Sequence, residues 1–226
     1  GFSDLFGKAL CDLAQENTNI AAVTAAMPAG TGLMKFSALY PERFFDVGIA
    51  EQHAVTFSAG LAKAGMIPVF AVYSSFLQRG YDQLIHDVAL QKLHVVFAID
   101  RAGAVGKDGE THQGIYDLSY LAHIPGMTIL APSCAQDFEQ MLRYAVCECD
   151  GPVAVRYPRG SALPAQWRIS PLRSGKGSMV REGSDVLLIA VGIMVQEALA
   201  AADLLQKENI SAGVLDARFI KPLDIA

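Results

Sequence analysis

The chain has 226 residues, of which 52 % are hydrophobic, so it is long enough to bury one large core or two modest ones. Its net charge of −5 gives no basic footprint for nucleic acid, so a nucleic-acid-binding protein is excluded. No apolar run approaches the ~20 residues that a helix needs to cross a membrane, so no membrane span is predicted.

The cysteines are too few and too scattered for a disulfide framework, which predicts reduced thiols in a cytosol-like compartment. They are Cys11, Cys134, Cys147 and Cys149. The chain begins without an initiator Met and stops just after a strand pattern. We therefore expect a part of a longer protein, whose targeting segment, if it has one, lies outside this sequence.

Short apolar runs alternate with helical patterns along the first 160 residues. Helices are predicted at residues 2–13, 33–39, 50–64, 75–91, 117–122 and 134–148, with Ser3 as a candidate N-cap of the first. Strands are predicted at residues 20–24, 43–47, 67–73, 94–100, 127–131 and 152–157. This alternation predicts βαβ units and an α/β fold, with a mostly parallel sheet covered by helices on both faces.

The pattern changes after residue 160. Residues 161–183 carry Pro164, Pro171, several glycines and several charges, which predicts a linker with some extended structure. A strand, a helix and a second strand follow, and this single βαβ unit is too small to bury both faces of its sheet. We therefore predict a first domain at 1–160, a linker at 161–183 and part of a second domain at 184–226.

A carboxylate stands where one predicted strand passes into a helix. The apolar run that begins at Phe44 ends a strand, Gly48 allows a tight turn, and Glu51 heads the next helix. Sites in open α/β sheets collect at the carboxyl ends of strands. From position alone, however, the commoner interpretation is that Glu51 only complements the helix dipole.

Several long motifs resemble those of thiamine-diphosphate enzymes. The segment DVGIAEQHAVTFSAGLA, residues 46–62, resembles the glutamate-bearing segment of the pyrimidine-binding domain in the transketolase group. Residues 73–91, 99–121 and 155–160 narrow the resemblance to the 1-deoxy-D-xylulose-5-phosphate synthase family. The resemblance runs from about Phe2 to the end of the chain. It covers only part of the family's enzyme, because the diphosphate-binding domain that comes first in that family has no counterpart in this sequence.

The resemblance implies a transferase that decarboxylates pyruvate and joins the remainder to D-glyceraldehyde 3-phosphate. The products are 1-deoxy-D-xylulose 5-phosphate and CO2, in the first step of non-mevalonate isoprenoid biosynthesis. It also implies thiamine diphosphate and Mg2+, a homodimer, and a cytoplasmic location, or a plastid one if a transit peptide is removed. The alternatives are a transketolase, a 2-oxoacid dehydrogenase β-subunit, or a non-catalytic partner domain of the same fold.

The resemblance assigns four residues to the cofactor. Glu51 would hydrogen-bond the aminopyrimidine ring and favour the form in which the cofactor acts as its own base. Ile49 would hold the cofactor bent, Phe76 would stack on the aminopyrimidine ring, and Tyr73 would line the pocket. From the residues alone, Ile49, Phe76 and Tyr73 are at least as consistent with a plain hydrophobic core.

Arg101 and Arg159 each follow a separate predicted strand, so their guanidinium groups could converge on one anion. The resemblance assigns them to the phosphate of glyceraldehyde 3-phosphate. Arg79, one helical turn beyond Phe76, is within reach of the same pocket. Outside this context, either Arg101 or Arg159 would be interpreted as a solvated surface arginine.

The glycine-rich loop at 101–114 carries Asp108 and His112, which by resemblance face the substrate. We expect His112 to assist proton transfers and Asp108 to position a polar group. Without the family context, a loop histidine is usually exposed and has no role. The residues around Asp108 lack the first glycine and the later asparagine of the metal motif of thiamine enzymes, so the metal and the diphosphate are expected outside this chain.

Overall fold

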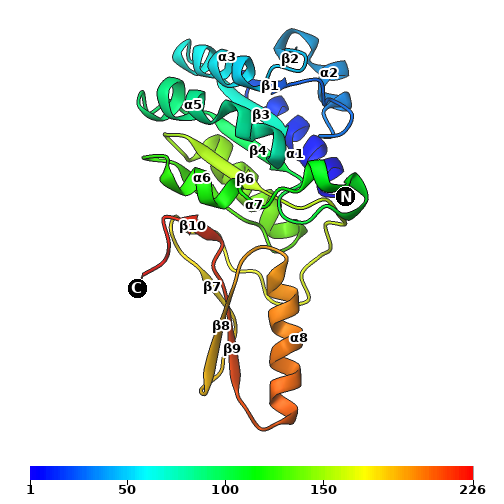
Figure 1. Ribbon diagram of the computed structural model, residues 1–226, viewed down its shortest axis with the longest axis vertical. Helices are drawn as coiled ribbons and strands as arrows, with labels where there is room; N and C mark the ends of the chain where they lie inside the picture. The colour runs from blue at the N-terminus through cyan, green and yellow to red at the C-terminus, as the bar shows by residue number, and fades with distance from the viewer. Residues whose placement is uncertain (226) are drawn as a thin grey trace.

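The computed structural model describes residues 1–225, and Ala226, at the end of the last predicted segment, lies outside them. The strands of the larger sheet are β1 (Ile20–Thr24), β2 (Phe44–Asp46), β3 (Ile67–Tyr73), β4 (Val96–Asp100), β5 (Thr128–Leu130), β6 (Val153–Arg156) and β10 (Phe219–Lys221). They form a seven-stranded sheet in the order β10-β5-β6-β4-β3-β1-β2 (Figure 1). Every neighbouring pair is parallel except β10 with β5. The predicted α/β class with a mostly parallel sheet is confirmed.

Helices cover both faces of this sheet. They are α1 (Phe2–Glu16), α2 (Met34–Leu39), α3 (Glu51–Lys63), α4 (Ser74–Leu77), α5 (Tyr81–Gln83), α6 (Asp117–His123) and α7 (Ala135–Cys147). Short 3-10 turns are η1 (Pro41–Arg43), η2 (Gln78–Gly80), η4 (Gly106–Asp108) and η5 (Glu110–His112). The segment η3 (Leu84–Ala89) is a π-helical turn. Strand residues alternate between two buried clusters, as the period of two requires. In β4, Val96 and Ala98 pack in the cluster of α1, α2 and α7, whereas Phe97 and Ile99 pack in the cluster of α3 and α6.

The helix predicted at 75–91 is broken into α4, η2, α5 and η3. The break falls at Gly80, where a Cβ atom would lie 2.9 Å from Cγ2 of Val55 in α3. Because glycine has no Cβ atom, the backbone at Gly80 can approach α3 closely without a clash with Val55. The N-cap prediction for Ser3 was wrong, because α1 already begins at Phe2 and the Ser3 hydroxyl donates instead to Asp100.

The smaller sheet has three strands in the order β7-β9-β8, where β7 is Ser178–Arg181, β8 is Val186–Ala190 and β9 is Ala212–Asp216. The pair β8 and β9 is parallel and is connected by helix α8 (Met194–Lys207), so the predicted βαβ unit is confirmed. Strand β7 lies inside the predicted linker and pairs antiparallel with β9. The chain then returns to the larger sheet as β10, a pairing that no sequence pattern predicted.

A buried ion cluster joins the two sheets. Nη2 of Arg218, which precedes β10, lies 3.0 Å from Oδ1 of Asp137 in α7, and both side chains are at most 2 % exposed. Asp216 at the end of β9 accepts the backbone N–H of Arg218 at 3.0 Å. Burial raises the pKa of Asp216 to about 7, and the nearby Asp137 carboxylate adds to the shift.

Candidate active site

A pocket opens at the carboxyl edge of the larger sheet, where three neighbouring strands end. Its lining residues come from the segments that follow β1, β2 and β3. They are Ala25, Ala26, Met27, Ile49, Glu51, Phe76 and Arg79. This is the edge at which ligands of open α/β sheets bind, and it places one acidic, one basic and one aromatic side chain around a single cavity.

Glu51 is the buried acid of this pocket. It is the first residue of α3, and its side chain is only 5 % exposed. Nε of Arg79 lies 3.9 Å from Oε2 of Glu51, but the Arg79 side chain is 71 % exposed. An ion pair with so exposed a partner contributes little. The buried carboxylate therefore remains available to a group that enters the pocket.

Ile49 lies on the rim of the same pocket and is 87 % exposed. This exposure rules out the alternative that Ile49 is a core residue. An isoleucine held out at the mouth of a pocket offers apolar contact to whatever occupies it.

Three rings gather beside the pocket. The rings of Tyr73 and Phe76 are stacked with centroids 5.5 Å apart, and the His112 ring lies edge-on to Phe76 at 5.0 Å. His112 reaches this place because the loop at 101–114 folds back, with a bridge between Gly103 and Gly114 closing its base. The structure thus places an imidazole from the loop at 101–114 against two aromatic rings from a much earlier segment of the chain.

Arg101 is fixed rather than solvated. Its side chain is 12 % exposed, and its guanidinium carbon lies 4.0 Å above the Tyr73 ring. Nη1 donates to the carbonyl oxygen of Gly30 at 2.7 Å and to Oδ2 of Asp100 at 2.9 Å. The interpretation of Arg101 as a surface arginine is therefore wrong.

Arg101 and Arg159 meet at one carboxylate. Asp108 forms an ion pair with Nη1 of Arg159, and its Oδ2 lies 3.5 Å from Nε of Arg101. The anion that these two arginines share in this structure is therefore a side chain of the loop itself. The arrangement can hold a doubly charged oxyanion if Asp108 moves aside.

Sequence reasoning missed Asp100, Ser3 and Gly30, which hold Arg101 in place. Asp100 is fully buried, and its Oδ2 also accepts the Ser3 hydroxyl at 2.6 Å. Burial raises the pKa of Asp100, whereas the hydrogen bonds from Ser3 and Arg101 oppose that shift. A signal was present in the sequence, because Asp100 is the single charge at the end of an otherwise apolar strand and such a charge requires a partner.

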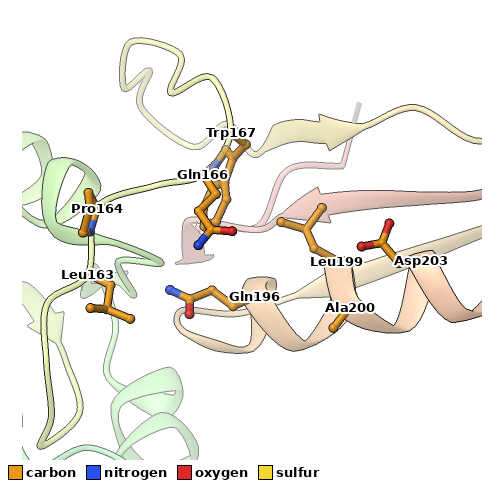
Figure 2. Close-up of a pocket in the computed structure, with 8 residues that line it drawn as sticks. All are labelled: Leu163, Pro164, Gln166, Trp167, Gln196, Leu199, Ala200 and Asp203. Carbon is orange, nitrogen blue, oxygen red and sulfur yellow. The ribbon is translucent and has the colours of Figure 1, made fainter.

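A second pocket lies between the segment at 163–167 and α8 (Figure 2). Its lining residues are Leu163, Pro164, Gln166, Trp167, Gln196, Leu199, Ala200 and Asp203. Asp203 is the single charged group among them, and it pairs with Arg181 at 2.6 Å. This pocket therefore lacks the acid, base and aromatic combination of the first.

Within residues 1–225, no cluster of three or more His, Cys, Asp or Glu side chains is arranged to hold a metal ion. No helix in that part of the chain is long and apolar enough to span a membrane.

Comparison with known proteins identifies the family. Residues 1–164 match the family model described as "Transketolase, pyrimidine binding domain", and residues 175–226 match "Transketolase, C-terminal domain". The chain belongs to the transketolase family. Its resemblance to this family, noted in the motifs around Glu51, is thereby confirmed.

The curated relatives are more specific. The 1-deoxy-D-xylulose-5-phosphate synthase of Chlorobium luteolum is 56 % identical over 227 residues, which cover 100 % of this chain and 36 % of the relative. The protein named 1-deoxy-D-xylulose-5-phosphate synthase 1 from Geobacter sulfurreducens is 56 % identical over 225 residues, covering 99 % of this chain and 35 % of the relative. The chain thus spans about a third of the length of these relatives.

Solved transketolase-family structures share the fold. A split-gene transketolase, described as an inactive beta4 tetramer, superposes with a TM-score of 0.86 at 34 % identity, covering 97 % of this chain and 72 % of the other. The transketolase of Campylobacter jejuni superposes with a TM-score of 0.87 at 21 % identity, covering 97 % of this chain and 35 % of the other. The second likeness shows the fold alone.

Proposed function

We propose that this chain is the pyrimidine-binding part of a 1-deoxy-D-xylulose-5-phosphate synthase. The enzyme would decarboxylate pyruvate and transfer the remainder to D-glyceraldehyde 3-phosphate, giving 1-deoxy-D-xylulose 5-phosphate and CO2, for isoprenoid biosynthesis. The observation that carries the proposal is the buried carboxylate of Glu51 in a pocket with Phe76, beside two arginines that share one anion. The names of relatives at 54–56 % identity support the same reaction.

The pocket fits the aminopyrimidine ring of thiamine diphosphate. A buried carboxylate can hold a hydrogen bond to a ring nitrogen, and the exposed face of an aromatic side chain suits a planar ring. In this assignment Glu51 holds the ring nitrogen, Phe76 covers the ring face, and Ile49 and Tyr73 form the walls. When bound, the cofactor supplies the carbanion chemistry that decarboxylates a 2-oxoacid and adds the remaining carbons to an aldehyde.

The acceptor would bind on the other side of the aromatic rings. Arg101 and Arg159 would hold the phosphate of glyceraldehyde 3-phosphate, which would replace the carboxylate of Asp108 between them. Asp108 would then be free to position a polar group of the substrate. His112, in contact with Phe76, would carry a proton to or from the reacting oxygen. Arg79 would shield the mouth of the pocket next to Glu51.

We propose that the diphosphate and Mg2+ are held by a region outside this chain, since the chain spans about a third of its relatives. We further propose a cytoplasmic homodimer and a division of the chain into 1–160, 161–183 and 184–226. On this account the chain by itself has no synthase activity.

The proposal is tested by assaying the full-length protein that carries this chain, with thiamine diphosphate and Mg2+ present. Pyruvate and glyceraldehyde 3-phosphate should give 1-deoxy-D-xylulose 5-phosphate and CO2 in equal amounts. A ketose phosphate donor with an aldose phosphate acceptor should give no product. Transfer from the ketose phosphate instead would identify a transketolase, and synthase activity from the 226-residue chain alone would contradict the assignment of the diphosphate site.

A further inference from the structure

The carboxylate of Asp100 is buried directly behind the proposed phosphate site. Asp100 ends β4 and is fully buried. Its Oδ1 accepts the backbone N–H of Arg101 at 2.7 Å, and its Oδ2 accepts Nη1 of Arg101 at 2.9 Å and the hydroxyl of Ser3 at 2.6 Å. A buried carboxylate is stable only when it is paired and hydrogen-bonded in this way. Every one of these contacts leads either to Arg101 or to the first turn of α1.

Arg101 adopts a backbone conformation that a non-glycine residue rarely takes. Its φ is +58°, and its guanidinium carbon lies 4.0 Å above the ring of Tyr73, which ends the neighbouring strand β3. The guanidinium group is then held by Asp100, by the carbonyl of Gly30 and by the ring of Tyr73, and Nη1 also donates to the Ser3 hydroxyl at 3.4 Å. Because Arg101 is already ordered, it loses less conformational entropy on binding an anion than a freely moving arginine would.

One edge of this fixed guanidinium is left without a hydrogen bond. Nε of Arg101 is buried and has no hydrogen-bond partner among the described residues, and the same holds for Oδ2 of Asp108, 3.5 Å away. A buried N–H donor without an acceptor is costly, so it marks a position where an oxygen of a ligand would be stabilised. The contacts on Nη1 are what direct this edge toward Asp108.

We propose that Asp100 is a positioning residue for acceptor binding, and that Ser3 in turn fixes Asp100. Asp100 holds Arg101 so that its free edge faces the phosphate of the acceptor, without itself touching the substrate. This inference rests on the proposed function, because it takes the phosphorylated aldehyde to be the ligand of Arg101. It extends the site from the strand ends to the N-terminal turn of α1.

Asp100→Asn tests this inference in the full-length protein. Asparagine keeps the size of the side chain and an acceptor for the Arg101 N–H, but it removes the charge that holds the guanidinium group. The KM for glyceraldehyde 3-phosphate should rise about tenfold, while kcat stays within about twofold. The KM for D-glyceraldehyde, the same aldehyde without phosphate, should not change. Inhibition by inorganic phosphate should weaken in parallel with the KM for the phosphorylated acceptor.

Ser3→Ala is the milder second variant, which removes the hydrogen bond to Asp100 and the 3.4 Å hydrogen bond that Nη1 of Arg101 donates to the Ser3 hydroxyl. It should raise the same KM about threefold. Asp12→Asn is the matched control, because Asp12 lies exposed on the same helix, where it pairs with the exposed Lys8. It should leave all constants unchanged.

The outcomes separate this inference from the proposed function. If the wild-type protein makes product and both variants keep the wild-type KM for glyceraldehyde 3-phosphate, Asp100 does not position Arg101 and the inference is wrong. Equal losses with the phosphorylated and unphosphorylated aldehydes would show a purely structural role and would also overturn it. A wild-type protein that makes no product overturns the proposed function itself and, with it, the ligand assigned here.

Discussion

The guanidinium group of Arg159 forms an ion pair with the carboxylate of Asp108, 51 positions earlier in the chain. Arg159 follows β6, whereas Asp108 belongs to the loop at 101–114. Oδ2 of Asp108 also lies 3.5 Å from Nε of Arg101. The contact therefore gathers two positive charges around one negative charge at the edge of the sheet.

Arg159→Ala should weaken binding of the phosphorylated acceptor. Without Arg159, only Arg101 remains to hold the phosphate, and a charge-assisted hydrogen bond is worth about 1.5–3 kcal/mol. We expect the KM for glyceraldehyde 3-phosphate to rise about ten- to a hundredfold in steady-state assays of the full-length protein, with little change for D-glyceraldehyde. Arg168→Ala, in the exposed linker, is the control. An unchanged KM for the phosphorylated acceptor would count against the assignment.

Glu51→Gln should abolish most turnover without damage to the fold. Glutamine has the same size, but it cannot present a carboxylate to the aminopyrimidine ring, and acid–base roles of this kind are worth about 10²–10⁴-fold. The lost ion pair with the exposed Arg79 costs little stability. Turnover should therefore fall by about 10²-fold or more, whereas circular dichroism and the melting temperature should stay as in the wild type. Glu42→Gln, at an exposed position, is the control and should behave as wild type. Near-normal turnover of Glu51→Gln would refute the role of Glu51.

Gly30→Ala should displace Tyr73 and so disturb the support of Arg101. A Cβ atom on Gly30 would lie 1.8 Å from the hydroxyl oxygen of Tyr73 and 2.9 Å from the ring carbon that bears it. Overpacking of this kind costs about 1–3 kcal/mol of unfolding free energy, which urea denaturation of the 226-residue chain can measure.

Adding Tyr73→Phe to Gly30→Ala should recover part of that loss, because it removes the closest atom. Strict additivity of the two substitutions would contradict the clash. Gly60→Ala is the matched control, because a Cβ atom at that helical position meets nothing within 4 Å. Alanine should be neutral or stabilising there by up to about 1 kcal/mol.

The stability of the chain should depend on pH through Asp216. Burial raises its pKa from 3.8 to about 7, so between these values the folded state holds a proton that the unfolded state has released. The contribution of Asp216 to the unfolding free energy therefore falls as pH rises through this window, by about 1.4 kcal/mol per pH unit, and levels off above about pH 7. Asp137 and Arg218 are the charged groups that face Asp216.

Asp216→Asn should remove this dependence. Relative to wild type, the variant should gain about 1.6 kcal/mol of unfolding free energy between pH 5.5 and pH 7. Urea denaturation at several pH values measures the difference, with Asp203→Asn on the exposed face of α8 as control. Parallel pH profiles for wild type and Asp216→Asn would show that Asp216 does not carry a proton in the folded state.

Much of the fold was predictable because its determinants are local. Apolar residues at helical spacing predicted α1, α3 and α7, and short apolar runs predicted the parallel strands. The close approach of Gly80 to Val55 was not predictable, because it depends on how two helices pack against each other. The pairing of β10 with β5 likewise joins strands about 90 residues apart, and the residue pattern of neither strand indicates which strand it pairs with.

The sequence by itself determined the order of the strands and main helices in the first 160 residues, and it placed Glu51 at a strand-to-helix junction and both arginines after strand ends. Those features follow from periodicity and turn residues, which act over a few positions. Only the tertiary structure decided that Arg101 and Arg159 share Asp108, that Ser3 binds Asp100, and that His112 meets Phe76. These contacts join side chains brought together when the parallel strands align their carboxyl ends, and no local pattern encodes which residues then meet.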